Sequence, residues 1–272
     1  MKTMSLKAGL LATCLISAAS AAPQSAAVPD FSSNQAAWTG IGGGEFIPVP
    51  GSPRPVTQDS RYRYVPNGQG AQPTYRIGDV TNPNLKQWAK DAMKKDNDEV
   101  LAGKIGYTPR SSCKPGGVPG FMVMGGGSVF FVQSRDKVLM MFDGDAQVRR
   151  VHLNATHSAN PKPSWYGESI GHYEGDTLVV DTIGLNSKTF VDAYRTPHTE
   201  KLRVTERWRL IDNGERLEVL ITIDDPDTFN QPWQALRRYA REKAASFPEE
   251  ICAENNQHLF DYGIPEADKP DF

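Results

Sequence analysis

The sequence predicts a mostly β protein in which an antiparallel meander of strands closes into a barrel. Segments with the composition and alternation of β-strands recur from Phe121 to Arg241. Compact turns containing Gly, Asp or Asn separate neighbouring segments, which is typical of hairpins. A meander of about eight strands removes its open edges as a barrel or as a sandwich, and we expect the barrel.

The individual strands are expected wherever apolar and polar residues alternate between two turn signals. Their expected ranges are 122–124, 129–133, 138–142, 147–154, 169–173, 177–182, 202–211, 217–224 and 234–241. The expected turns are residues 125–127, 143–145, 174–176 and 212–215. Because a small barrel can hold one ligand inside, its inward-facing residues are the first candidates for a functional site.

One amphipathic helix and a long leader are expected before the barrel. Residues 22–80 are treated as an extended leader, because residues 23–60 are rich in Pro, Gly, Ser and Ala without strand or helix periodicity. The helix is expected to start at Asn82 as N-cap with Pro83 next, and to end at Gly103. Residues 81–272 then form one helix-plus-barrel domain, although the length also allows two packed halves.

The N-terminus has the pattern of a cleaved signal peptide. Lys2 and Lys7 come before a short apolar run that starts at Ala8. The small residues Ala19-Ser20-Ala21 follow this run and give a cleavage site near Ala21. We therefore expect residues 1–21 to be removed and the protein to reach the periplasm of a Gram-negative cell. Lipidation at Cys14 is the alternative. No later segment approaches the ~20 apolar residues of a membrane-spanning helix.

Charge and cysteine content restrict the possible partners and the compartment. The net charge of −2 becomes −4 when Lys2 and Lys7 are removed, so neither nucleic acid nor an anionic membrane is an expected partner. Cleavage leaves Cys113 and Cys252, and an even pair in an oxidising compartment predicts a disulfide. Two buried free thiols are the alternative.

The segment 202–211 carries a carboxylate on an apolar face. Alternation places Glu206 and Trp208 on one face and Arg207 on the other. A buried carboxylate must be neutralised, paired or turned toward a polar cavity. Glu206 is therefore either a catalytic or ligand-binding group, or one half of an ion pair, for example with Arg150 or Arg237.

Histidines in loops are the candidate proton carriers, because imidazole changes charge near neutral pH. His157 lies between two expected strands, and His198 lies in a loop beside Arg195. A surface or hydrogen-bonded loop position is the alternative for each histidine. Asp181 falls where alternation allows burial, and it belongs to a catalytic site or to a structural network.

Metal and nucleophile signatures are weak. No HExxH motif is present, and the cysteines are too few and too far apart for a zinc cluster, so no metal site is expected. Residues 167–171 match the G-x-S-x-G pattern of a nucleophile elbow around Ser169. This pattern leads into an expected hairpin rather than a helix, so its glycines are better explained by crowding in a bent strand.

The run WYGESIGHYEGDTLVVDTIG, residues 165–184, resembles the signature of a large family of exported proteins from proteobacteria and acidobacteria. Further matching pieces are residues 197–207, Asp225-Pro226 ahead of Pro232-Trp233, and the segment from Cys252 to Asn256. His172-Tyr173 departs from the usual Arg-Trp, and Ala253 replaces a common His. The resemblance implies a calycin-like barrel. It also implies that the recurrent polar positions are His157, Trp165, Ser169, Asp181, His198, Glu206 and Arg207.

The chain also has a looser resemblance to sphingomonad lyases that remove formaldehyde from lignin-derived phenylcoumarans. We therefore predict a periplasmic lyase that acts on a small, mostly apolar, aromatic molecule by proton transfer, without an organic cofactor. Glu206 or His198 would accept a proton, with His157 as a further catalytic candidate. Arg207 or Arg195 would stabilise an oxyanion. Trp165 and Trp208 would hold the aromatic ring.

Two other classes of protein remain open at this point. The first is a non-catalytic, lipocalin-like protein whose buried polar residues orient a small hydrophobic ligand. The second is a structural protein of the envelope, which would expose an apolar patch instead of enclosing a ligand.

Overall fold

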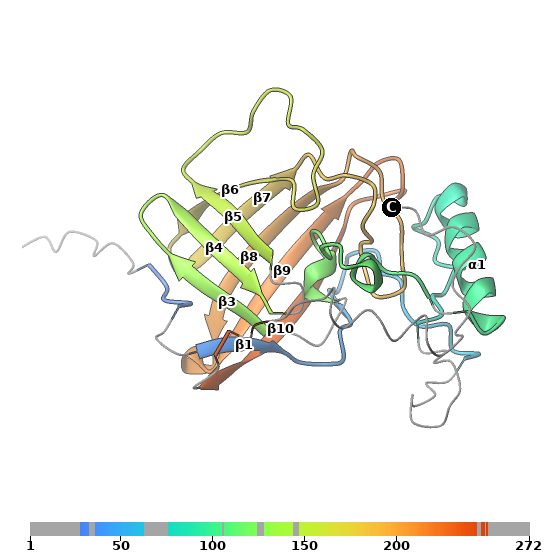
Figure 1. The fold of residues 1–272 in the computed structure, drawn as a ribbon, viewed down its shortest axis with the longest axis horizontal. Coiled ribbons are helices and arrows are strands. Elements are labelled where there is room, and N and C mark those ends of the chain that lie inside the picture. The colour runs from blue at the N-terminus through green and yellow to red at the C-terminus, as the bar shows by residue number, and fades with distance from the viewer. Residues whose placement is uncertain are drawn as a thin grey trace, which may run out of the picture.

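The computed structural model describes residues 28–32, 36–62, 76–104, 106–123, 128–143, 147–243, 246–247 and 249. Nine strands of this part of the chain form a closed, mixed β-barrel, which confirms the prediction of a barrel. The barrel is consistent with a calycin-like fold. Figure 1 shows it beside α1 (Gln87–Leu101), the one α-helix of the described residues. The expected signal peptide, Cys14 and Cys252 lie outside these residues.

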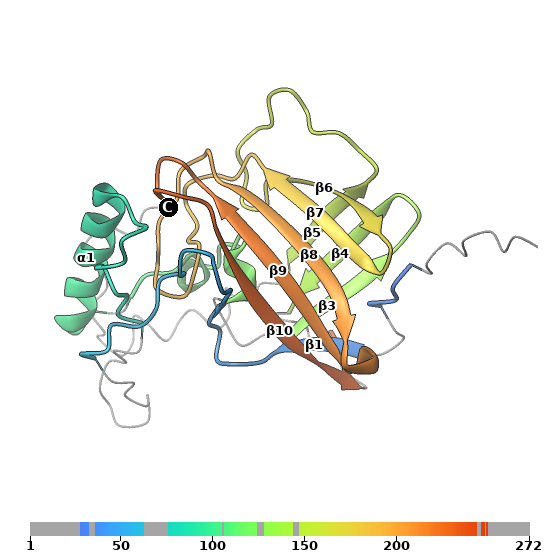
Figure 2. The same cartoon turned by 180° about the vertical axis from the view of Figure 1, so that it is seen from behind.

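The barrel strands follow one another in chain order around the sheet, and β10 returns to pair with β1. The barrel strands are β1 (Ala36–Gly40), β3 (Ser128–Gln133), β4 (Lys137–Phe142), β5 (Gln147–Leu153), β6 (Glu168–Glu174), β7 (Thr177–Ile183), β8 (Arg203–Ile211), β9 (Arg216–Asp224) and β10 (Trp233–Lys243). The short β2 (Ile47–Pro48) adds to β10. The 3-10 turns are η2 (Pro109–Ser112), η3 (Gly120–Met122) and η4 (Asp212–Gly214). Figure 2 shows the long β8–β9–β10 face from behind.

Strand β1 closes the barrel, although its residues were expected to belong to a draped leader. It pairs antiparallel with β10 along its whole length and with β3 at Trp38 and Thr39. Trp38 is fully buried and donates its Nε1–H to the carbonyl of Phe31 at 2.8 Å. The leader prediction is therefore wrong for residues 36–40. Five residues are too few to show clear alternation, and only the paired strands around them identify the segment.

One junction breaks the expected antiparallel meander. β5 and β6 pair in parallel, with Val151 opposite Ser169 and Leu153 opposite Gly171. Parallel neighbours need a long crossover, and residues 154–167 supply one, seen as the high loop in Figure 1. The prediction of a purely antiparallel sheet is wrong at this point.

The expected strand at 122–124 is also not observed at its described residues. Gly120–Met122 form η3, a 3-10 turn that follows Gly117 with φ 69°. Phe121 and Met122 are buried, so the apolar run is explained by a 3-10 turn that packs into the core rather than by a strand. The expected turns 125–127 and 144–145 lie outside the described residues.

Helix α1 packs on loops rather than on the sheet, and it begins later than expected. Lys86 is its N-cap, not Asn82, because Leu85 forms a bridge with Phe229. Trp88 Nε1–H donates to the carbonyl of Asp227 at 2.6 Å, which ties the helix to the β9–β10 connection. Ala102 is the C-cap, and Gly103 follows it with φ 88°, the left-handed conformation expected after a helix.

The barrel interior is lined by alternate residues of the strands, because successive side chains of a strand point to opposite faces. The buried apolar members include Phe131, Met140, Val151, Leu178, Val180, Val204, Trp208, Val219, Ile221 and Ala235. Phe31 packs on Phe131 with ring centroids 5.4 Å apart, near the last residue of β3. Phe121 packs on Phe142, near the opposite end of β3. Aromatic side chains therefore cover the core toward both ends.

Candidate functional site

A buried ion pair spans the barrel interior between β5 and β8. Arg149 Nη1 donates to Glu206 Oε1 at 2.9 Å, and Arg149 Nη2 donates to Glu206 Oε2 at 2.5 Å. The two side chains are 2% and 0% exposed. Two charges withdrawn from water are tolerated only when each compensates the other. The ion-pair interpretation of Glu206 therefore holds, with Arg149 as the partner instead of Arg150 or Arg237.

Two hydroxyl groups extend the pair into a network with one residue from each of four consecutive strands. Arg149 Nε donates to Ser169 Oγ at 3.2 Å, and Nη2 donates to Thr182 Oγ1 at 2.8 Å. The two hydroxyls lie 2.9 Å apart. Ser169 lies on β6, which continues as a hairpin into β7, so it has no nucleophile elbow. It is instead a buried partner of Arg149.

The glycines around Ser169 relieve crowding, as the sequence predicted. A Cβ on Gly171 would lie 2.9 Å from the carbonyl oxygen of Val179 and from a methyl group of Val151. Gly167 has φ +61°, and a Cβ there would lie 2.4 Å from the carbonyl of Ile183. Both positions need glycine for close backbone approach.

Three aromatic residues add polar groups to the interior. Trp208 Nε1, Trp233 Nε1 and Tyr239 Oη are buried and have no hydrogen-bond partner. The rings of Trp208 and Tyr239 are neighbours, with centroids 5.8 Å apart. Burial raises the pKa of Tyr239 well above its ordinary value, so its hydroxyl keeps its proton as a donor. Buried donors without acceptors are rare in native proteins and often mark a place for a ligand or water.

The turn η3 covers the network from one end of the barrel. The Arg149 guanidinium lies over the ring of Phe121, with its central carbon 5.5 Å from the ring centroid. Phe121 also packs on Tyr166, at 6.4 Å between ring centroids. The cation–π contact and the aromatic cover exclude water from this side of the ion pair.

His198 is buried in the loop before β8, and both of its ring nitrogens have protein partners. Nδ1 lies 2.9 Å from the carbonyl of Thr199, so it must carry the proton, and Nε2 accepts from Thr189 Oγ1 at 2.7 Å. Burial lowers the pKa of His198, opposed by the Thr199 carbonyl and by Asp225. The imidazole is therefore neutral near pH 7 and positions its loop.

His157, Asp181 and Arg207 lie on the outer face of the barrel, away from Glu206. His157 bridges Glu168 and Asp181, at 2.9 Å from each carboxylate. Arg207 is 42% exposed and donates to Glu174 at 2.7 Å. Alternation along β7 and β8 turns Asp181 and Arg207 outward, because their neighbours Val180 and Glu206 face inward. His157 reaches Asp181 from the loop between β5 and β6. The structure does not bring them together with Glu206.

Arg195 and Trp165 lie in loops outside the network. Arg195 has φ 60° and is buried, and its nearest carboxylate is Asp96 of α1, at 3.8 Å. It therefore faces the helix rather than Glu206. Trp165 is partly buried ahead of β6, where its carbonyl faces Gly117.

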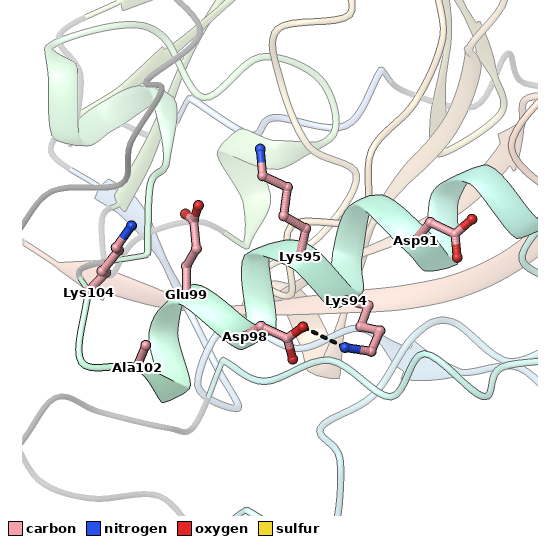
Figure 3. Close-up of a pocket in the computed structure, with 7 residues that line it drawn as sticks. All are labelled: Asp91, Lys94, Lys95, Asp98, Glu99, Ala102 and Lys104. Carbon is pink, nitrogen blue, oxygen red and sulfur yellow. Dashed lines mark hydrogen bonds and ion pairs between the residues drawn. The ribbon is translucent and has the colours of Figure 1, made fainter.

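A hollow beside α1 is a second candidate site for a ligand. It is lined by Asp91, Lys94, Lys95, Asp98, Glu99, Ala102 and Lys104 (Figure 3). Lys94 and Asp98 pair at 2.5 Å but are 65% and 59% exposed. None of the residues that line it has an unpartnered buried side-chain atom, so the barrel interior is the better candidate.

The fold and the network define a closed, mixed β-barrel with a polar site buried inside it. No protein-family model matches this chain, and no curated protein matches it. In the described part of the chain, no three His, Cys, Asp or Glu residues are placed to hold a metal. No helix among the same residues has the length and apolar character needed to cross a membrane.

Sequence reasoning found Glu206, Ser169 and Trp208 but missed Arg149, Thr182 and Tyr239. Alternation had placed Arg149 on the same face as Val151, which is fully buried, and this was the available signal. Tyr239 lies two residues after Arg237 on one face of β10. The signal for both was a polar group on a face that is otherwise apolar.

Proposed function

We propose that the protein binds a small, mostly apolar and aromatic molecule inside its barrel. The observation that carries this proposal is the pair of neighbouring donors Trp208 Nε1 and Tyr239 Oη, which are buried without acceptors. Leaving such a group unsatisfied costs about 1–3 kcal/mol, so an acceptor on a ligand would be favoured there. Phe131 packs edge-to-face on Trp208, with ring centroids 5.5 Å apart, and the two rings form an aromatic wall.

A lyase reaction on the same ligand is the second candidate, and the position of Glu206 favours it. Glu206 and Ser169 were both predicted as site residues, and both belong to the interior network. Glu206 would accept the proton of a substrate hydroxymethyl group, and the carbon–carbon bond to that group would break with release of formaldehyde. The electron pair would leave on the phenolic oxygen, which takes up the proton, while Arg149 and the two hydroxyls stabilise charge. The resemblance to formaldehyde-releasing lyases and the expected export to the periplasm agree with a lignin-derived phenolic substrate.

Ligand binding is tested by tryptophan fluorescence with vanillin and a phenylcoumaran dimer as probes. We expect saturable quenching in the wild type and loss of most of it in Trp208→Phe. Trp88→Phe is the matched control, because Trp88 lies on α1 and is 41% exposed. Quenching that does not saturate, or that is unchanged in Trp208→Phe, would remove the interior site.

Catalysis is tested on the same mixtures by mass spectrometry and formaldehyde detection. Intact probe after incubation indicates a binding protein, whereas formaldehyde and a shortened product indicate a lyase. Glu206→Gln should abolish product release if Glu206 is the base. A variant that still turns over at the wild-type rate excludes that role.

A further inference from the structure

Arg237 is a second arginine inside the barrel, and its charge has no carboxylate partner. It is 4% exposed and lies on β10 between the inward-facing Ala235 and Tyr239. Its Nε donates to the carbonyl of Met122 at 3.1 Å, and its Nη1 donates to the carbonyl of Ile41. Among the described residues, no salt bridge involves Arg237 and no hydrogen bond uses its Nη2.

The interior charges consequently do not balance. Arg149 is neutralised by Glu206, whereas Arg237 is held only by two backbone carbonyls. A buried cation is normally paired with an anion, because carbonyl dipoles offset only part of its lost hydration. The described interior therefore carries one positive charge more than it has anions to match.

The unpartnered donors lie next to this cation. The central carbon of Arg237 is 5.5 Å from the ring centroid of Tyr239, and the ring of Tyr239 is 5.8 Å from that of Trp208. The positive charge of Arg237 lowers the pKa of the Tyr239 hydroxyl, against the larger effect of burial. A guanidinium only donates hydrogen bonds, so the hydroxyl proton still lacks an acceptor. One cation without a carboxylate partner and two buried donors without acceptors are therefore gathered in one part of the interior.

Glycine at position 40 allows Arg237 to occupy this place. A Cβ at Gly40 would lie 2.3 Å from Arg237 Nη2. Strand β1 therefore passes close to the guanidinium at the position where it pairs with Tyr239 of β10. The backbone of β1 and the turn η3 together hold Arg237 beside Tyr239.

We propose that Arg237, Tyr239 and Trp208 form a subsite for the carboxylate of an aromatic acid. This inference rests on the proposed function and adds the chemical class of the ligand. A carboxylate supplies the missing negative charge and has two oxygens that accept from Arg237 Nη2 and from the Tyr239 hydroxyl or the Trp208 indole. The aromatic part of the ligand then lies against Trp208 and Phe131.

The test compares two probes that differ only at the acidic group, 3-phenylpropanoate and 3-phenylpropanol, by titration calorimetry on the full chain. We expect the wild type to bind the acid about 10- to 100-fold more tightly than the alcohol, the usual value of a charge-assisted hydrogen bond. Arg237→Met and Tyr239→Phe should weaken the acid toward the affinity of the alcohol. The affinity for the alcohol should change little.

Arg238→Met is the matched control, because Arg238 points outward and donates to Glu218 at 2.8 Å. It should keep the preference for the acid. If Arg237→Met does not fold, Tyr239→Phe alone tests the preference for the acid, since this substitution removes only the hydroxyl oxygen. Equal binding of the two probes, or a preference that survives in Tyr239→Phe, overturns the carboxylate subsite but leaves ligand binding intact. Binding of neither probe counts against both the subsite and the proposed function.

Discussion

At the scale of single residues, the pair Arg149–Glu206 places two opposite charges inside the barrel. Both side chains are essentially removed from solvent, and each oxygen of Glu206 accepts from Arg149. Removing one partner leaves the other charged and buried, which typically costs 3–5 kcal/mol, whereas replacing both with apolar groups is often neutral.

Glu206→Gln should therefore lower the free energy of unfolding by about 3–5 kcal/mol, measured by urea denaturation. The double variant Arg149→Met, Glu206→Leu should recover most of that loss. The exposed pair Arg207–Glu174 is the control, and Arg207→Gln should change stability by less than about 1 kcal/mol. Equal losses for the buried and the exposed variants would contradict the structure.

Asp192 gives a second prediction at this scale, on the pH dependence of stability. Its buried carboxylate accepts from the backbone of Tyr194 and from Thr196, and burial raises its pKa from 3.8 to about 6. Between these values the unfolded chain releases the proton that the folded chain keeps, so stability falls as pH rises from about 4 to 6. Above about pH 6 Asp192 is ionised in both the folded and the unfolded chain, so its effect on the free energy of unfolding no longer changes with pH.

Asp192→Asn should therefore gain stability relative to the wild type as the pH is raised from 4 to 7, by roughly 3 kcal/mol. Chemical denaturation of both proteins across this range measures the difference. The comparison with the variant is needed because the lowered pKa of His198 acts in the opposite sense, reducing stability as the pH falls below 6.5. Parallel pH profiles for the two proteins would show that Asp192 ionises normally.

At the scale of elements, β1 decides whether the sheet is open or closed. Its five residues pair on both sides, and Trp38 fills the interior beneath Arg241, whose guanidinium carbon lies 4.5 Å from the Trp38 ring centroid. Strand β1 is thus part of the barrel core, although the sequence around it is rich in glycine and proline.

Trp38→Ala should destabilise the protein by about 3–5 kcal/mol, the usual cost of deleting a buried large aromatic side chain. Trp88→Ala, on the partly exposed face of α1, should cost much less. Thermal and urea unfolding of the two variants make the comparison. A small effect at Trp38 would mean that residues 36–40 do not belong to the barrel in solution.

The bounds of the strands and of the helix show which elements the local sequence pattern can predict. The strands from β3 to β10 were predicted within one or two residues, because each is long enough to display alternation. The helix start was placed too early, since Asn82 and Pro83 have helix-start chemistry but belong to a turn anchored on Asn230. The parallel β5–β6 pair was missed because strand direction depends on the path of residues 154–167, which alternation does not encode.

At the scale of the whole molecule, the expected disulfide would connect the residue after η2 to the C-terminal segment. Cys113 lies at the end of η2 with φ 56°, and Cys252 lies beyond the described residues. The bridge remains a prediction from the sequence. It would close a loop with 138 intervening residues.

Peptide mapping under non-reducing conditions should recover Cys113 and Cys252 in one linked peptide. Reduction, or the variant Cys113→Ser, should then lower stability by about 4–5 kcal/mol, because a long loop is released in the unfolded chain. Two alkylatable thiols in the native protein would contradict the prediction.

The sequence by itself determined the fold class, most strand positions and the presence of a carboxylate on an inward face. These properties follow from the two-residue period of a strand, which is written locally in residues such as Val204, Glu206 and Trp208. Only the tertiary structure decided that Arg149 neutralises Glu206, that β1 closes the barrel, and that Arg237 and Tyr239 lie beside Trp208. The physical reason is that these contacts join strands far apart in sequence, and barrel closure sets which inward-facing groups meet.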